Sequence, residues 1–171
     1  EMGEKGVAFC PTIHFMPDWF QAFPPQYDPA LHDAYPGETV TEKELARLYD
    51  NLRQAKAYGV LLTIGSDSCN SQMTPYGKTA VGEIHSFVEK AGISEMDAIV
   101  AATSNGAKAL GVSEITGTLE KGKSADLLVL LGDPLQDIQQ LAVENMAVIM
   151  KEGDLIRCRL RCAQELFPLY D

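Results

Sequence analysis

One carboxylate stands where an apolar strand is expected to end. Residues 60–64 form a short apolar run, and the sequence Gly65-Ser66-Asp67-Ser68 follows at once. Barrels of parallel strands keep their catalytic groups at the carboxyl ends of those strands. A carboxylate at such a place can bind a divalent metal ion, or accept a proton from an attacking water. Asp67 is therefore the leading candidate for chemistry, and capping of the turn after the strand is the alternative.

Small residues surround Asp67 and are expected to support it. Ser66 and Ser68 flank the carboxylate and are predicted to hydrogen-bond it, which would orient it. The sequence has no Gly-x-Ser-x-Gly motif here, so neither serine is predicted to be a nucleophile. Gly65 is expected to permit a sharp turn after the strand. Glu83, further along the chain, is expected either to brace the Asp67 loop or to lie on a solvated helix face.

Two further residues are candidates for contact with a substrate. His14 follows Pro11-Thr12 at the end of a strand-like run over residues 7–10, and Tyr76 lies in the polar loop after Asp67. The alternative for His14 is a packed or surface histidine. His32 and His85 are expected to lie in a Pro-rich loop and on a helix surface, and no two histidines have the His-x-His spacing.

The composition excludes several function classes. Fourteen basic and 24 acidic residues give a net charge of -10, which argues against nucleic acid and anionic membrane surfaces. No apolar run approaches the roughly 18 residues of a membrane span. The first residues have no apolar core typical of a signal peptide. The four cysteines lack C-x-x-C spacing, so they are predicted to be free thiols in a reducing, cytoplasmic compartment.

Alternating strand and helix signals must position these residues. Thr41 and Glu44 form a capping box before a helix that Gly59 ends, and the apolar run after it is typical of a buried parallel strand. Ser94 is expected to cap a further helix. The remaining predicted elements are a helix over residues 79–91 with Ile84, Phe87, Val88 and Ala91 on one face, a helix body over 98–110, strands over 117–120, 126–131, 146–150 and 155–157, and a hairpin turn at 151–154.

The order of motifs resembles a known family. After the strand ending in Pro11-Thr12 come Gly65-Ser66-Asp67-Ser68, then Ala101-Ala102-Thr103-Ser104-Asn105-Gly106-Ala107, and then the most specific stretch, Gly117-Thr118-Leu119-Glu120-Lys121-Gly122-Lys123-Ser124-Ala125-Asp126-Leu127. This is similar to the carboxyl-terminal portion of the amidohydrolase superfamily, in its imidazolonepropionase-like and Xaa-Pro dipeptidase-like (prolidase) branch. The resemblance covers about residues 7–157.

The resemblance implies an α/β fold. It consists of the last two β/α units of a TIM-type (β/α)8 barrel, with a portion of a small β-sandwich. Residues 7–10 and 60–64 would be barrel strands seven and eight. The implied division is a barrel portion over residues 1–112, a sandwich portion over residues 113–157, in which Asp126 is structural, and a short helix or tail over residues 158–171. A whole barrel needs about 250 residues, so this chain resembles roughly the last two-fifths of such an enzyme.

The resemblance also implies a chemistry, in which Asp67 is both metal ligand and proton acceptor. Such enzymes hydrolyse C–N bonds of cyclic amides or Xaa-Pro-type dipeptides with metal-activated water, and zinc is the default metal. The family's His-x-His pair, its carboxylated Lys or Glu, and its two further histidines are absent from this chain. One carboxylate holds a metal poorly, since catalytic sites use about three protein ligands.

Two interpretations remain. In the first, the chain is a portion of a metal-dependent hydrolase that is active only with a missing amino-terminal barrel part and acts on a small-molecule substrate. In the second, it is a non-catalytic truncated or proteolytic fragment that associates with another copy through exposed barrel strands. Both predict association, because two barrel strands leave open edges and bare apolar faces.

Overall fold

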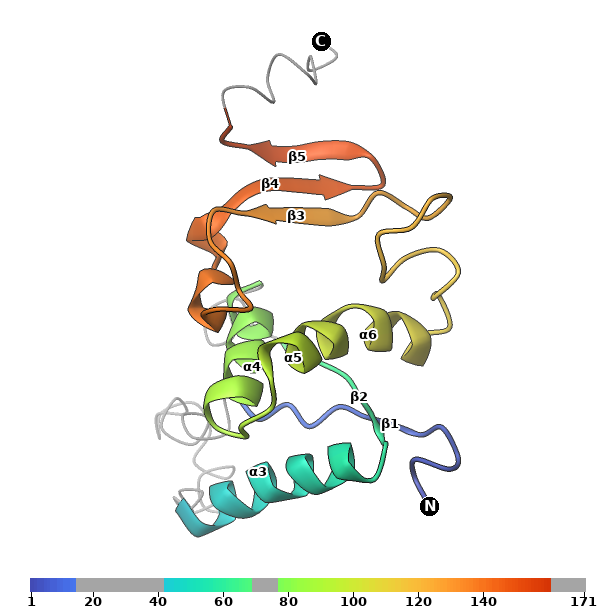
Figure 1. The fold of residues 1–171 in the computed structure, drawn as a ribbon, viewed down its shortest axis with the longest axis vertical. Helices are drawn as coiled ribbons and strands as arrows, with labels where there is room; N and C mark the ends of the chain where they lie inside the picture. The colour runs from blue at the N-terminus through green and yellow to red at the C-terminus, as the bar shows by residue number, and fades with distance from the viewer. Residues whose placement is uncertain (15–41, 69–76, 161–171) are drawn as a thin grey trace, which may run out of the picture.

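The computed structural model describes residues 1–14, 42–68 and 77–160, and it shows a mixed α/β arrangement (Figure 1). No helix in these described ranges has the length and apolar character needed to cross a membrane. In chain order the elements are β1 (Ala8–Phe9), α3 (Glu42–Ala57), β2 (Leu61–Leu62), α4 (Lys78–Glu89), α5 (Glu95–Ala102), α6 (Ser104–Ala109), β3 (Leu127–Leu130), two 3-10 turns (Ile138–Gln140 and Val143–Asn145), β4 (Met146–Lys151) and β5 (Asp154–Cys158).

The strands β1 and β2 are parallel neighbours, as the apolar run over residues 60–64 predicted. Ala8 pairs with Leu61 and Phe9 pairs with Leu62. The Thr63 N–H extends this ladder by donating to the Phe9 carbonyl at 3.0 Å. Both strands are shorter than their apolar runs. In the described ranges each strand has one neighbour, and a two-stranded pair twists strongly and sustains few regular residues.

Helix α3 leads into β2 through the glycine that its sequence predicted. Gly59 has a φ of 68°, which a glycine adopts without strain. The Gly59 N–H donates to the Lys56 carbonyl at 2.9 Å and the Val60 N–H donates to the Ala55 carbonyl at 3.0 Å. These two bonds form a Schellman motif, which closes the helix and directs the chain into the strand. The capping residue Thr41 lies outside the described residues.

The main core lies between α3, the strand pair and the helices that follow. In Figure 1, β1 and β2 lie between α3 and the group α4 to α6. Helix α4 buries the face that its sequence predicted, with Phe87 at 0% exposure. The cluster of buried side chains that forms this core also includes residues between β3 and β4. Its buried members are Ile13, Leu52, Leu62, Ile84, Phe87, Ala91, Ile93, Ala98, Ala101, Ile138 and Leu141.

The helix predicted over residues 98–110 is in fact two helices. Ser94 caps α5 as predicted, and its hydroxyl accepts from the Asp97 N–H at 3.2 Å. The chain then breaks at Thr103, which has φ −120° and ψ −91°, before α6 begins. The Thr103 hydroxyl donates to the Ile99 carbonyl at 2.7 Å, a local bond that competes with the helix ladder. After this break, α6 contacts β2.

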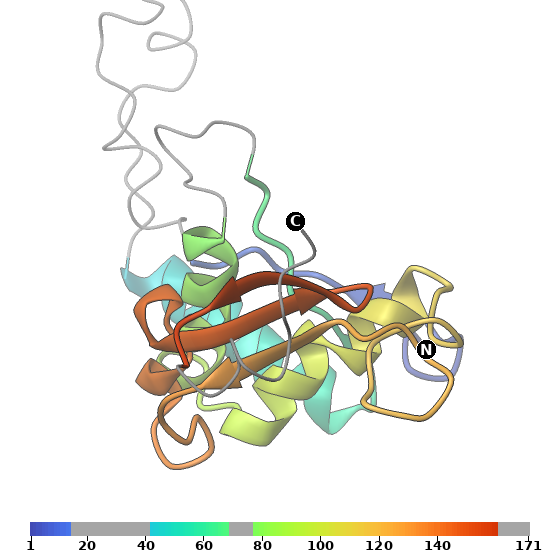
Figure 2. The same cartoon turned by 90° about the horizontal axis from the view of Figure 1, so that it is seen from above.

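A three-stranded antiparallel sheet, in the order β3-β4-β5, lies on the far side of the helices from α3 (Figures 1 and 2). The predicted hairpin turn joins β4 to β5. Glu152 and Gly153 both have positive φ, as a type I′ turn requires. The strand predicted over residues 117–120 is wrong. Gly117 has a φ of 97° and packs against Ala107, where a Cβ on Gly117 would lie 2.5 Å from the alanine side chain.

Asp126 fastens the hairpin to the segment before β3. Its carboxylate accepts from the Glu152 N–H at 2.8 Å, the Thr116 hydroxyl at 2.9 Å and the Lys151 ammonium at 3.1 Å. These bonds, led by the one from the Glu152 N–H, lower the pKa of Asp126 to about 2. The bonds agree with the structural role expected from the sequence.

Candidate functional site

Asp67 lies in the turn after β2, with its side chain exposed. Its φ of 45° is left-handed, a conformation that aspartate tolerates better than most residues. The strand before it is anchored from the side, because the Asn105 amide of α6 donates to the Leu62 carbonyl at 3.0 Å. This hydrogen bond joins the end of β2 to α6, just before the segment that leads to Asp67.

The turn after β1 lies beside the turn after β2. Thr12 has a φ of 48°, which is an outlier for a β-branched residue. A Cβ on Gly65 would lie 2.3 Å from the Cys10 sulfur and 3.5 Å from the Thr12 methyl. The expectation for Gly65 is therefore corrected. Its φ is not left-handed, and its lack of a side chain instead makes room for Cys10, so that the two turns can meet.

A buried carboxylate from α4 holds the turn after β1. Glu83 is 1% exposed. One of its oxygens accepts from the Ile13 N–H at 2.8 Å and the other accepts from the His14 N–H at 2.6 Å. Burial raises the pKa of Glu83 above its usual range, and the two backbone bonds partly oppose that rise. Burial also raises the pKa of Tyr49, with a further contribution from the negative charge of Glu83.

The sequence around Glu83 carries a pattern that indicates its burial. The expectations were that it braces the Asp67 loop or faces solvent, and the structure shows that it braces the neighbouring turn. Thr79, Gly82, Glu83 and Ser86 are all buried and recur at helical spacing. A stripe of small residues with one acid, beside a strongly apolar stripe, indicates a second buried face and a paired carboxylate.

His14 lies against α4. Its Nδ1 is 3.2 Å from the Ser86 hydroxyl, and its ring covers Gly82, where an added Cβ would be 2.2 Å from Nε2. A substrate contact by this residue stays a prediction. His85, on the same helix, is half-buried, and its Nε2 lies 2.9 Å from the Leu141 carbonyl. It therefore joins α4 to the turn before β4.

The two helical glycines provide a test of the His14 packing. An alanine in place of a helix-interior glycine usually stabilises by about 0.5–1 kcal/mol. We expect that gain for Gly106→Ala, whose Cβ would have its nearest neighbour at 3.7 Å. Gly82→Ala should lack that gain, because the methyl group overlaps the His14 ring and would displace it from α4. Urea unfolding measures both variants, and a stabilising Gly82→Ala would contradict the described packing.

The remaining site residues are not brought together. The Ser68 hydroxyl is buried and has no hydrogen-bond partner among the described residues. The hydrogen bond predicted from Ser68 to Asp67 is therefore absent. A bond from Ser66 to Asp67 stays a prediction, and Tyr76 lies outside the described residues. Within residues 1–14, 42–68 and 77–160, no three His, Cys, Asp or Glu side chains are grouped to hold a metal ion. The described donor set therefore does not fit a complete metal site.

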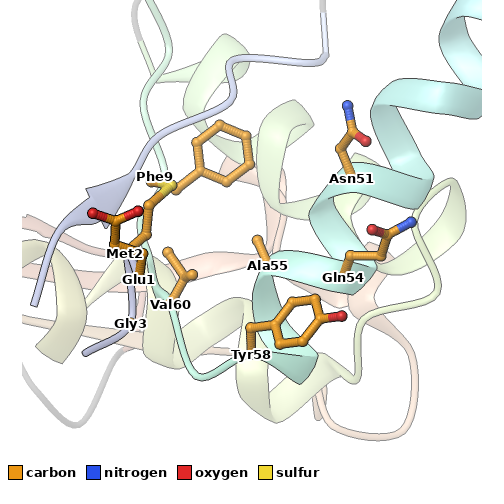
Figure 3. A pocket seen from close by; sticks show the side chains of 9 residues that line it. All are labelled: Glu1, Met2, Gly3, Phe9, Asn51, Gln54, Ala55, Tyr58 and Val60. Atoms are coloured by element: carbon orange, nitrogen blue, oxygen red, sulfur yellow. The ribbon is translucent and has the colours of Figure 1, made fainter. Parts of the chain in front are cut away.

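One pocket, of about 450 Å³, is lined by nine residues (Figure 3), and Asp67 is not among them. It is bordered by Val60 and Tyr58, before β2, whereas Asp67 follows that strand. Its other lining residues are Glu1, Met2, Gly3, Phe9, Asn51, Gln54 and Ala55. The surface of this lining is mainly apolar.

Comparison with known proteins places this chain in a family. The chain matches the Amidohydrolase family over residues 5–156. Over 118 residues it is 33% identical to the imidazolonepropionase of Syntrophobacter fumaroxidans. This match covers 68% of this chain and 27% of that protein. The superfamily expected from the sequence motifs is thus confirmed.

Solved structures agree with the sequence match. A Xaa-Pro dipeptidase with bound methionine in its active site has a TM-score of 0.66 and 30% identity, covering 91% of this chain and 36% of that one. The A. niger ochratoxinase has a TM-score of 0.67 and 26% identity, covering 92% of this chain and 33% of that one. The chain thus spans 36% or less of the length of each of these proteins.

Proposed function

The chain belongs to the amidohydrolase family, and from this premise we propose that it is the carboxyl-terminal portion of a metal-dependent hydrolase of C–N bonds. The proposed substrates are cyclic amides or Xaa-Pro-type dipeptides. Similarity to an imidazolonepropionase and to a Xaa-Pro dipeptidase supports these two classes. In this proposal β1 and β2 are barrel strands seven and eight, and residues 113–157 contribute to a small β-sandwich.

The observation that carries the proposal is the placement of Asp67. Its turn follows a parallel strand and lies beside the turn after the neighbouring strand, at the edge where barrel enzymes assemble their sites. Asp67 would provide one carboxylate ligand to a divalent metal, with zinc as the proposed ion. The metal would supply Lewis acidity, and Asp67 would take up the proton of the attacking water.

The activity is proposed to depend on a partner. Asp67 alone does not make a metal site in the part of the chain that the structure describes. The remaining ligands would come from an amino-terminal barrel part, either upstream in the same product or on another chain. We place this assembly in the cytoplasm, as the free thiols suggested.

The test compares the chain alone with the assembled barrel. The 171 residues alone should bind zinc substoichiometrically. Co-expression with the amino-terminal barrel part of a Xaa-Pro dipeptidase-type relative should give hydrolysis of Xaa-Pro dipeptides or cyclic amides that a chelator removes and zinc restores. A metal-loaded assembly without hydrolysis would refute the proposed activity. Stoichiometric, tightly bound zinc in the chain alone would refute its dependence on a partner.

A second candidate is a non-catalytic fragment that associates with its own copies. The observation in its favour is exposed apolar surface, both in the predicted barrel strand over residues 7–10, where Val7 is 42% exposed, and on β3 and β5, where Leu128 and Ile156 are 47% and 64% exposed. This candidate predicts a dimer or larger species by light scattering, and no hydrolysis when the amino-terminal part is added. The activity assay therefore separates the two candidates.

A further inference from the structure

We propose that Glu83 is a positioning residue, which fixes the turn after β1 beside Asp67 and so sets the geometry of the site. The inference rests on the proposed function for its catalytic meaning, and on the contacts of Glu83 for its physical basis. Helix α4 follows the Asp67 segment in the chain, yet its carboxylate binds the turn of the other strand. Glu83 thus joins the two turns through a rigid helix.

The burial of Glu83 makes its two bonds obligatory. A carboxylate removed from water is costly unless donors surround it. Here each oxygen accepts from a different N–H, on the consecutive residues Ile13 and His14. Because these donors belong to the backbone, they cannot rotate away as a side chain would. The carboxylate and the turn therefore fix each other's position.

The turn that Glu83 holds is conformationally strained. Thr12, directly before the two donors, has a φ of 48°. Such a conformation persists where surrounding contacts over-determine it, and strain of this kind gathers at functional sites. Helix α4 supplies those contacts from one face: Glu83 binds the backbone, Gly82 makes room for the His14 ring, and Ser86 contacts its Nδ1.

A direct role in proton transfer does not fit Glu83. At 1% exposure it has almost no access for a substrate, and each oxygen is already engaged by an amide. Its effect must pass through the residues that it holds. The turn after β1, rather than the glutamate itself, would then contact a substrate bound near Asp67.

Hydrogen exchange of the 171-residue chain tests the positioning directly. Glu83→Gln keeps the shape of the side chain but leaves one amide without its acceptor. Exchange at one of the two residues Ile13 and His14, the one whose N–H then faces the glutamine nitrogen, should accelerate by about tenfold, as expected for the loss of one hydrogen bond. Exchange at Phe87, in the core of the same helix, should stay unchanged. Glu89→Gln, a charge-matched change at an exposed position of α4, should alter none of these amides.

Two exchange results would overturn the inference. Unchanged exchange at Ile13 and His14 would show that Glu83 does not hold the turn. Equal acceleration at Phe87 would show a general packing role instead.

Activity of the assembled barrel gives a second measurement. Glu83→Gln should lower kcat/KM by about tenfold, with the bound metal content unchanged. A kcat/KM equal to that of Glu89→Gln would overturn the catalytic part of the inference. An assembly inactive even with the unaltered chain would refute the proposed function, while hydrogen exchange would still decide whether Glu83 holds the turn.

Discussion

Asp67→Asn is expected to lower kcat of the assembled hydrolase by about 10²–10⁴-fold, the usual contribution of a positioned proton acceptor. Asparagine has nearly the same shape and also tolerates the left-handed φ of 45° found here, so the turn should survive. What is lost is the negative charge, and with it both the proton acceptor and an anionic metal ligand. Steady-state kinetics at saturating zinc measure the fall in kcat, and elemental analysis measures the bound metal.

Asp154→Asn is the matched control for this experiment. Asp154 is also exposed and also lies next to a turn, at the start of β5, so the chemical change is the same. Its kcat should remain within about twofold of the unaltered protein, as for most surface changes. If Asp67→Asn retained full kcat and metal content, Asp67 would be a turn cap, and the alternative raised by its sequence would be correct.

Local sequence signals predicted the elements well where one residue decides the conformation. Gly59 closes α3, Ser94 caps α5, and the Glu152-Gly153 turn forms the hairpin, as expected. The parallel pairing of β1 and β2 also followed from an apolar run with no alternation. The cap, the helix end and the hairpin turn depend on neighbours within a few residues, whereas the strand pairing joins distant segments and was indicated by the burial that a continuous apolar run implies.

Features that depend on distant contacts were not predicted. Glu83 binds amides 69 and 70 positions earlier in the chain, and no local pattern identifies those partners. Gly65 was expected to serve a turn, and its actual role is to make room for Cys10 from the adjacent strand. The break at Thr103 falls between these two cases. The hydrogen bond from its hydroxyl to the Ile99 carbonyl is a local cause, but too weak to predict the break from the sequence. Packing between elements decided these features.

Helix α4 joins the site to the core, because it carries both Glu83 and Phe87. Phe87 is one of the largest fully buried side chains, so its truncation is expected to cause a large loss in stability. Phe87 is fully buried, and it follows Glu83 by one turn on the same helix. Phe87→Ala would leave a cavity among side chains from α3, β2 and α5. We expect the free energy of unfolding, measured by urea denaturation, to fall by about 3–5 kcal/mol, the usual cost of such a truncation.

Two further variants keep this prediction measurable. Phe87→Leu should lose less stability than Phe87→Ala, because leucine fills part of the volume. It therefore remains informative if the alanine variant does not fold, since domains have only about 5–15 kcal/mol in total. Leu110→Ala, at a side chain 78% exposed, should change stability by no more than about 0.5 kcal/mol. A loss for Phe87→Ala no larger than that for Leu110→Ala would mean that α4 is not anchored in the core, and the positioning of the turns by Glu83 would lose its rigid support.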